Sequence, residues 1–158
     1  MPELHRTLRR TFLRGSAASL LLPLLGTGLL RPTAAFAAPW KREAFSAAST
    51  GAGLKALNIP VLSETRDILV NAPEIAENGA KVDVEISSRL PDTRSLLLFA
   101  DKNPLPLCAE LEFGDNALPY AKVQIKLAES TRIRAVARTA DGKNHVAFRD
   151  IKVTLSGC

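Results

Sequence analysis

Metal ligands and catalytic bases are scarce in this chain of 158 residues, which contains two histidines, two cysteines and one methionine, the initiator. A zinc or copper site takes three or four nitrogen or sulfur ligands, and these few residues offer no such cluster. His145 follows Asp141-Gly142 with no nucleophile elbow nearby, so we expect a solvated hairpin histidine rather than a catalytic base. The chain also has no Gly-rich phosphate loop. We therefore expect no metal, no cofactor and no autonomous enzyme.

Acidic residues are nearly missing from residues 1–37, which contain five arginines and a single acidic residue, Glu3. The pair Arg9-Arg10 precedes an uncharged stretch over residues 16–30, and Ala35-Phe36-Ala37 has the small-residue pattern of a cleavage site. The alternative, a retained membrane anchor, needs roughly 20 uninterrupted apolar residues, more than this stretch has. The pattern predicts a twin-arginine (Tat) export signal that is cleaved before Ala38, and hence a folded protein delivered to the periplasm.

The basic character of the chain is concentrated in this segment. Its removal takes away five arginines and one glutamate, which leaves 16 basic and 15 acidic residues and lowers the net charge from +5 to +1. No stripe of Lys and Arg interleaved with aromatic residues remains. We expect no nucleic-acid partner, and no membrane association after the signal is removed.

Helical periodicity is also scarce in the rest of the chain. Residues 38–58 are predicted to form a short N-terminal helix or arm, on which Trp40 packs against the domain, with a linker-like break at Ser49–Gly53. Alternation of period two then begins, with Val82, Val84 and Ile86 facing a core. Short strands are predicted at 81–87, 94–101, 107–113, 120–127, 131–139, 145–148 and 151–155.

Turn residues separate these strands, and Asp141-Gly142 is a strong hairpin signal. About seven short strands at close spacing favour an all-β fold, an immunoglobulin-like antiparallel β-sandwich, over residues 59–155. Residues 156–158 are left as a flexible C-terminal tail that carries a cysteine.

The two cysteines have different settings. In the strand at 107–113, alternation places Cys108 on the face of Glu110 and Glu112, opposite a core face that begins with Leu107. That placement predicts a thiol at a partly covered face or at a partner interface. In an oxidising compartment a disulfide between Cys108 and Cys158 is the alternative, and it requires their Cα atoms to lie within roughly 7 Å.

Cys158 follows Ser156 and Gly157, directly after the last predicted strand. Three extended residues span at most about 10 Å, so such a tail can place its thiol in the pocket of another protein while the domain stays outside. The small residues give the tail its predicted flexibility. This arrangement suits covalent substrate attachment at Cys158 better than it suits an enzyme that must preorganise its own site.

The chain resembles the SoxY family, the sulfur carrier of the bacterial thiosulfate-oxidising (Sox) system. The resemblance runs through "APEIAENGAKVDVEI" (72–86), "DKNPLPL" (101–107), "VQIKLAESTRIRAVARTADGK" (123–143) and "IKVTLSGC" (151–158). The family tail usually reads GGCGG, whereas this sequence has Ser156 in place of the first glycine and ends at Cys158. The terminal carboxylate would then raise the pKa of that thiol, which puts processing by the usual partners in question.

The resemblance implies a non-catalytic carrier that binds thiosulfate-derived intermediates on Cys158. It also implies a heterodimer with a SoxZ-like β-sandwich subunit. A thiosulfate-loading cytochrome, a sulfate-releasing hydrolase and a sulfane dehydrogenase would act in turn on the attached sulfur. A second hypothesis, from another class, is a β-sandwich binding or scaffold subunit whose tail thiol is incidental or forms an intermolecular disulfide.

Overall fold

The computed structural model describes residues 40–154, which form two short helices followed by nine strands. The helices are α2 (Arg42–Phe45) and α3 (Thr50–Ala56). The strands are β1 (Ser63–Glu64), β2 (Ile68–Asn71), β3 (Ile75–Ala76), β4 (Val82–Ser88), β5 (Thr93–Ala100), β6 (Leu107–Glu112), β7 (Tyr120–Ile125), β8 (Thr131–Thr139) and β9 (Asn144–Val153).

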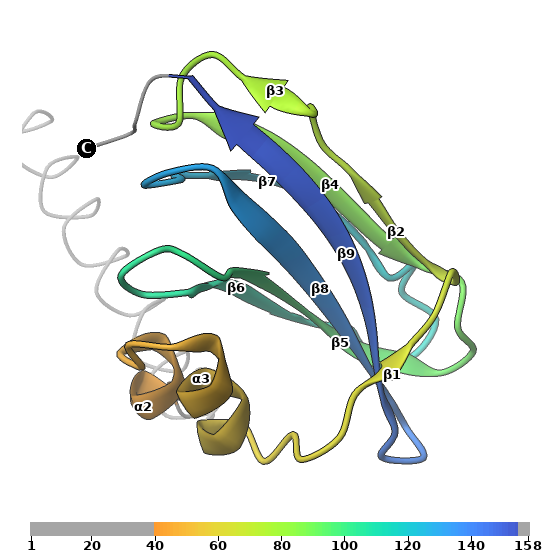
Figure 1. The fold of residues 1–158 in the computed structure, drawn as a ribbon. Coiled ribbons are helices and arrows are strands. Elements are labelled where there is room, and N and C mark those ends of the chain that lie inside the picture. Colours follow the sequence, from red (N-terminus) through yellow and green to blue (C-terminus); the bar gives the residue numbers. More distant parts are fainter. Residues whose placement is uncertain (1–39, 155–158) are drawn as a thin grey trace, which may run out of the picture. The chain divides into compact units, whose positions relative to one another are not determined.

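The strands form two sheets that pack face to face (Figure 1). Sheet A has the order β1-β9-β8-β5-β6, with β3 also paired to β9, and sheet B has the order β2-β4-β7. All pairings are antiparallel except those of β1 and β3, which run parallel to β9. The predicted all-β, immunoglobulin-like sandwich is confirmed.

The main core lies between the two sheets and follows the alternation in the sequence. In β4, Val82, Val84 and Ile86 are buried while Asp83 is exposed. Leu96 and Leu98 from β5 meet them from sheet A. Each fully buried aliphatic side chain of this kind contributes about 1.5–3 kcal/mol, so the period-two pattern decides which face of each strand turns inward.

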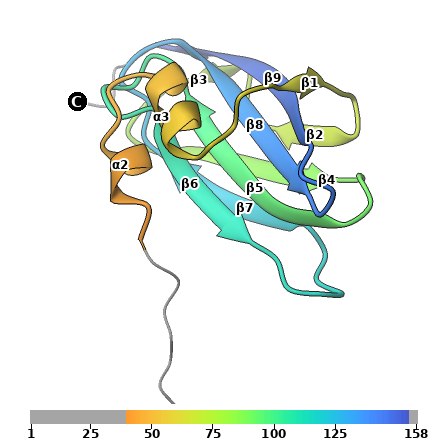
Figure 2. The same cartoon turned by 90° about the horizontal axis from the view of Figure 1, so that it is seen from below.

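β5 is buried on both faces, because the two helices cover part of the outer face of sheet A (Figure 2). Leu97 and Phe99, on the face away from sheet B, are completely buried against Ala44 and Leu57 from the helical segment. Lys41 Nζ, just before α2, also bonds Glu110 at 2.5 Å and Glu112 at 3.2 Å. The N-terminal segment is therefore a third layer over the sandwich.

The predicted break at Ser49–Gly53 is instead the start of α3. Ser49 is the N-cap, and its Oγ accepts a hydrogen bond from the backbone N–H of Ala52 at 3.2 Å. Burial of the helix against sheet A outweighs the low helix propensity of its glycines. Trp40 differs from expectation as well, since its ring is 76% exposed and lies edge-on to Phe45 at a centroid distance of 5.8 Å.

The two glycines of α3 give a matched pair for testing this packing. A Cβ added at Gly51 meets nothing within 4 Å, whereas one at Gly53 lies 3.2 Å from Cε1 of Phe99. We expect Gly51→Ala to raise the free energy of unfolding by about 0.5–1 kcal/mol through helix propensity, and Gly53→Ala to gain less because Phe99 must move. Urea unfolding of both variants measures the difference, and equal gains would contradict the close packing.

Two strand assignments differ from the sequence-based ones. The predicted strands at 145–148 and 151–155 are one continuous strand, β9, which pairs with β8 from Asn144 to Ile151. The short strands β1, β2 and β3 were not anticipated. The predicted hairpin at Asp141-Gly142 is confirmed, with Gly142 at φ 81°, in the region that favours glycine.

Candidate functional site

The predicted attachment residue Cys158, with Ser156 and Gly157, lies outside the described residues. The structure does describe the strand that leads to it. β9 is held on both sides close to its end, because Val153 N–H bonds Ser130 Oγ at 2.8 Å while Lys152 N–H bonds the Glu74 carbonyl at 2.8 Å. Thr154, the last described residue, still donates its backbone N–H to the Ala76 carbonyl at 3.1 Å. The tail thus starts from a firmly anchored point four residues before Cys158.

Cys108 does not lie where alternation placed it. Leu98 pairs with Ala109 but Phe99 pairs with Leu107, so Cys108 is the extra residue of a β-bulge in β6. Leu107 consequently packs with Phe99 under the helices, and Cys108 turns toward the core between the sheets. The prediction that Cys108 shares a face with Glu110 and Glu112 was wrong.

The environment of Cys108 makes it a poor nucleophile. Its Sγ donates to the Pro106 carbonyl at 3.4 Å. Burial raises the pKa of the thiol from 9.0 to about 11, and a backbone hydrogen bond from Ala100 offsets only part of that effect. Since the thiolate is the reactive form, we expect Cys108 to react more slowly than an ordinary exposed thiol.

His145 is the second residue of β9, where it pairs with Ala137 of β8 and Ser63 of β1 and is partly buried. It lies within the sheet and not in the solvated hairpin expected from the sequence. Within residues 40–154, no group of three or more His, Cys, Asp or Glu side chains is placed to hold a metal ion. No helix in the same range is long and apolar enough to cross a membrane.

Charged side chains on the outer face of sheet A, beyond α3, were not singled out from the sequence. Arg134 donates from Nε and Nη2 to the two carboxylate oxygens of Asp101, at 3.2 and 3.0 Å. The guanidinium groups of Arg132 and Arg134 both lie over the Phe148 ring, 5.4 and 5.1 Å from its centroid. These contacts form a charged surface along β8 and β9 on the outer face of sheet A.

Comparisons with known proteins agree with this architecture. The solved structure of the sulfur carrier protein SoxY from Chlorobium limicola f thiosulfatophilum is similar at a TM-score of 0.62 and 29% identity, covering 72% of this chain and 99% of that one. Two superoxide reductase structures share the fold alone. The neelaredoxin of Ignicoccus hospitalis has 21% identity and a TM-score of 0.50, covering 56% of this chain and 81% of its own. A putative superoxide reductase of Thermotoga maritima has 18% identity and a TM-score of 0.50, covering 58% and 93%.

No curated protein matches the chain. A family model described as sulfur oxidation protein SoxY matches residues 56–158, a range that includes the described sandwich from the end of α3 onward and continues through the tail. The match covers more than half of the chain and confirms the resemblance drawn from its motifs. The chain belongs to the SoxY family of sulfur oxidation proteins.

Proposed function

We propose that this SoxY-family protein carries thiosulfate-derived sulfur on Cys158 and presents it to partner enzymes in the periplasm. The observation that carries the proposal is the family match through residue 158, together with a last strand anchored up to Thr154. The pattern in residues 1–37 supports export of the folded protein through the twin-arginine pathway.

The chemistry begins at the thiolate of Cys158. Joining thiosulfate to it, Cys–S⁻ + S–SO₃²⁻ → Cys–S–S–SO₃⁻ + 2e⁻, forms a sulfur–sulfur bond and releases two electrons, which the thiosulfate-loading cytochrome accepts. Hydrolysis, Cys–S–S–SO₃⁻ + H₂O → Cys–S–S⁻ + SO₄²⁻ + 2H⁺, then removes the sulfonate group as sulfate. A sulfane dehydrogenase accepts six electrons in oxidising the outer sulfur, Cys–S–S⁻ + 3H₂O → Cys–S–SO₃⁻ + 6H⁺ + 6e⁻. A second hydrolysis, Cys–S–SO₃⁻ + H₂O → Cys–S⁻ + SO₄²⁻ + 2H⁺, then releases sulfate and frees the thiol for another cycle.

The carrier itself supplies attachment and delivery in this scheme. A thiol at the tail reaches the active sites of other proteins, while the sandwich provides the body that they recognise. A SoxZ-like β-sandwich subunit is the expected partner in a heterodimer, and the export signal supports joint passage of the folded pair. Cys108 is partly buried and the pKa of its thiol is raised to about 11, so it should compete only weakly for the sulfur.

Intact-mass spectrometry tests this function directly. Mature protein, incubated with thiosulfate and the loading cytochrome, is expected to gain the mass of one S₂O₃ group. Cys158→Ser should abolish the gain, because a hydroxyl cannot form the sulfur–sulfur bond, and Cys108→Ala should retain it.

Two results would contradict the carrier function at Cys158. One is an equal gain of mass on the Cys158→Ser protein. The other is the absence of any adduct, with Cys158→Ser abolishing only a dimer seen on non-reducing gels, which would favour the scaffold function instead.

A further inference from the structure

The segment with the motif PEIAENG (73–79) lies along the end of β9 and contains the two-residue strand β3 (Figure 1). Among the strands described over residues 40–154, β3 pairs with β9 alone. Of its two side chains, Ile75 is mostly exposed and Ala76 is small. Because so little apolar surface is buried, β3 contributes mainly through its backbone hydrogen bonds to β9.

The segment is itself held at both of its ends. At the start, Arg149 of β9 donates from Nη2 to the Ala72 carbonyl at 3.3 Å and to Glu74 Oε1 at 3.4 Å. At the far end, the Gly79 carbonyl accepts the backbone N–H of Leu127 at 2.7 Å. The segment is therefore a fixed support along which the last residues of β9 can pair.

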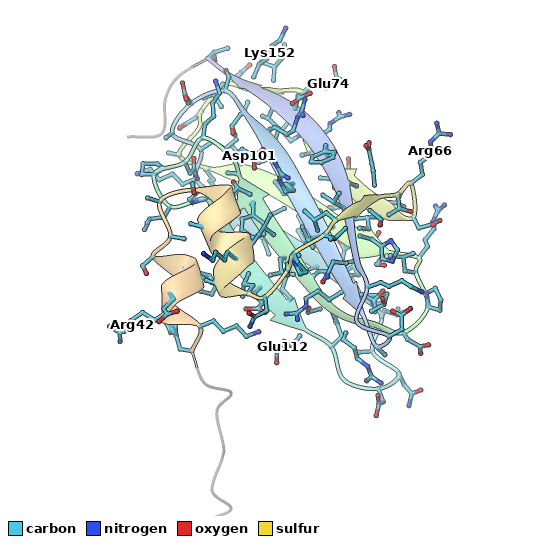
Figure 3. All side chains as sticks on the ribbon, turned by 60° about the horizontal axis from the view of Figure 1, so that its bottom comes forward. Arg42, Arg66, Glu74, Asp101, Glu112 and Lys152 are labelled. Carbon is cyan, nitrogen blue, oxygen red and sulfur yellow. The ribbon has the colours of Figure 1, made fainter. Side chains whose placement is uncertain are left out.

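β9 bonds this support up to its last described residue. Lys152 N–H donates to the Glu74 carbonyl at 2.8 Å, and Figure 3 shows these two residues side by side. Thr154 uses both of its donors, its N–H to the Ala76 carbonyl at 3.1 Å and its hydroxyl to the Glu77 carbonyl at 3.1 Å. Thr154 is thus held although it lies beyond the end of β9.

On the other side of β9, the side chain of Ser130 takes the place of a neighbouring strand. The ladder with β8 ends where Thr131 pairs with Ile151, so Val153 lies beyond it. Ser130 Oγ accepts the Val153 N–H at 2.8 Å and donates to the Val153 carbonyl at 3.4 Å. We call the groups that hold residues 152–154 the strand-end clamp: Ser130 Oγ and the carbonyls of Glu74, Ala76 and Glu77.

We propose that the strand-end clamp sets the reach of the Cys158 thiol, with Thr154 and Ser130 as positioning residues. This inference rests on the proposed function and adds what determines how deep the thiol enters a partner enzyme. Cys158 is four residues beyond Thr154, and four extended residues span at most about 14 Å. A pocket of matching depth then receives the thiol only when the domain rests against the entrance of the pocket.

Amide hydrogen exchange tests the clamp without any enzyme. The Thr154 amide is expected to exchange at least about tenfold more slowly than an unstructured amide, because it is bonded to the Ala76 carbonyl. Ser130→Ala removes the acceptor of the Val153 N–H and should speed exchange at Val153. The amide of Val136, in the middle of β8, should be unaffected and serves as the control.

Loading by the thiosulfate-loading cytochrome tests the reach. Deletion of Gly157 leaves three residues beyond Thr154, a span of about 10 Å, and should slow loading at least about tenfold. Thr154→Pro removes both donors of Thr154 and so moves the exit point back to Val153. Added to the deletion, it should restore loading to within about threefold of the parent, because the lost residue of reach is regained.

Two control variants separate reach from other effects of these changes. Deletion of Ser156 shortens the tail by the same amount and should slow loading equally, which excludes a special need for glycine. Thr154→Ser keeps both donors and should not rescue the Gly157 deletion. A residue that only stabilised the fold could not restore activity to a shortened tail when it is replaced.

A Thr154 amide that exchanges as fast as an unstructured one would overturn the clamp. Equal loading of the parent and the Gly157 deletion would overturn its control of reach, as would a lack of rescue by Thr154→Pro with the Lys152 amide still protected. If that protection is lost, the milder Thr154→Val, which lacks only the hydroxyl, takes its place and should restore part of the loading; no gain would overturn the proposal. A parent that never loads would contradict the proposed function instead, and Thr154 exchange would still decide whether the clamp forms.

Discussion

Native protein at pH 8 is expected to take up one thiol label, on Cys158, whereas the chain unfolded in guanidinium takes up two. The fold raises the pKa of Cys108 from 9.0 to about 11 through burial, which lowers its thiolate fraction about a hundredfold at this pH. The partial burial of Cys108 should slow the reaction further. Intact mass recorded during reaction with iodoacetamide gives the rate at each site.

The rate at which Cys108 reacts in the unfolded chain is the internal control for that measurement. The Cys158→Ser protein should take up no label while native and one label when unfolded. If Cys108 in the native protein reacts as fast as in guanidinium, its position in the core is incorrect. A disulfide between the two cysteines would instead block labelling of both until a reductant is added.

Phe99→Ala is expected to lower the free energy of unfolding by about 3–5 kcal/mol. Phe99 has no exposed surface and packs with Leu57 and Ala44 from the helical layer, close to Gly53 of α3. The truncation leaves a cavity between the helices and sheet A, so the helical layer should loosen before the sandwich unfolds. Urea unfolding measures the loss, and hydrogen exchange of the α3 amides reports the loosening.

Phe99→Leu serves as the matched control, because it keeps most of the buried volume and should cost under about 1.5 kcal/mol. Unchanged exchange of the α3 amides in Phe99→Ala would show that the helices do not depend on this contact. A loss below about 1 kcal/mol would likewise contradict the packing described for Phe99.

The sandwich was predictable where strands alternate cleanly between good turn signals. In β4, each inward aliphatic residue is separated from the next by a polar one, and in the β8–β9 hairpin Asp141-Gly142 marks the reversal. In such strands burial of one face and turn chemistry point to the same register. β2 and the two-residue strands β1 and β3 are too short to show a period, and their positions depend on pairing with distant strands.

Tertiary packing decided the features that sequence patterns missed. No pattern in the sequence of β6 marks the bulge at Cys108. The bulge nevertheless reverses the face of the sheet on which the preceding side chain lies. Arg149 and Asp150 interrupt the apolar pattern of β9, although ladder hydrogen bonds to β8 continue through them. The sequence predicts a break in the helix at Gly51 and Gly53. In the structure, the absence of a side chain at Gly53 instead lets α3 pack close to Phe99.

The candidate functional features likewise include one that the sequence predicts and one that only the folded structure shows. The tail thiol is a local signal, visible as Cys158 after two small residues, and it led to the family. The charged surface on the outer face of sheet A is assembled from Asp101, Arg134 and Phe148, which are far apart in sequence and come together only when β8 pairs with β5 and β9. No spacing rule links such residues before the register of the sheet is known.

The anchoring of β9 also has a mechanical consequence. Its hydrogen bonds to β8 on one side and to β3 on the other run across the strand direction. A pull on the tail by an enzyme that grips its cargo would load these bonds together in shear, instead of peeling them apart one at a time. If the tail is pulled as the proposed function requires, we therefore expect β9 to stay paired with β8 and β3.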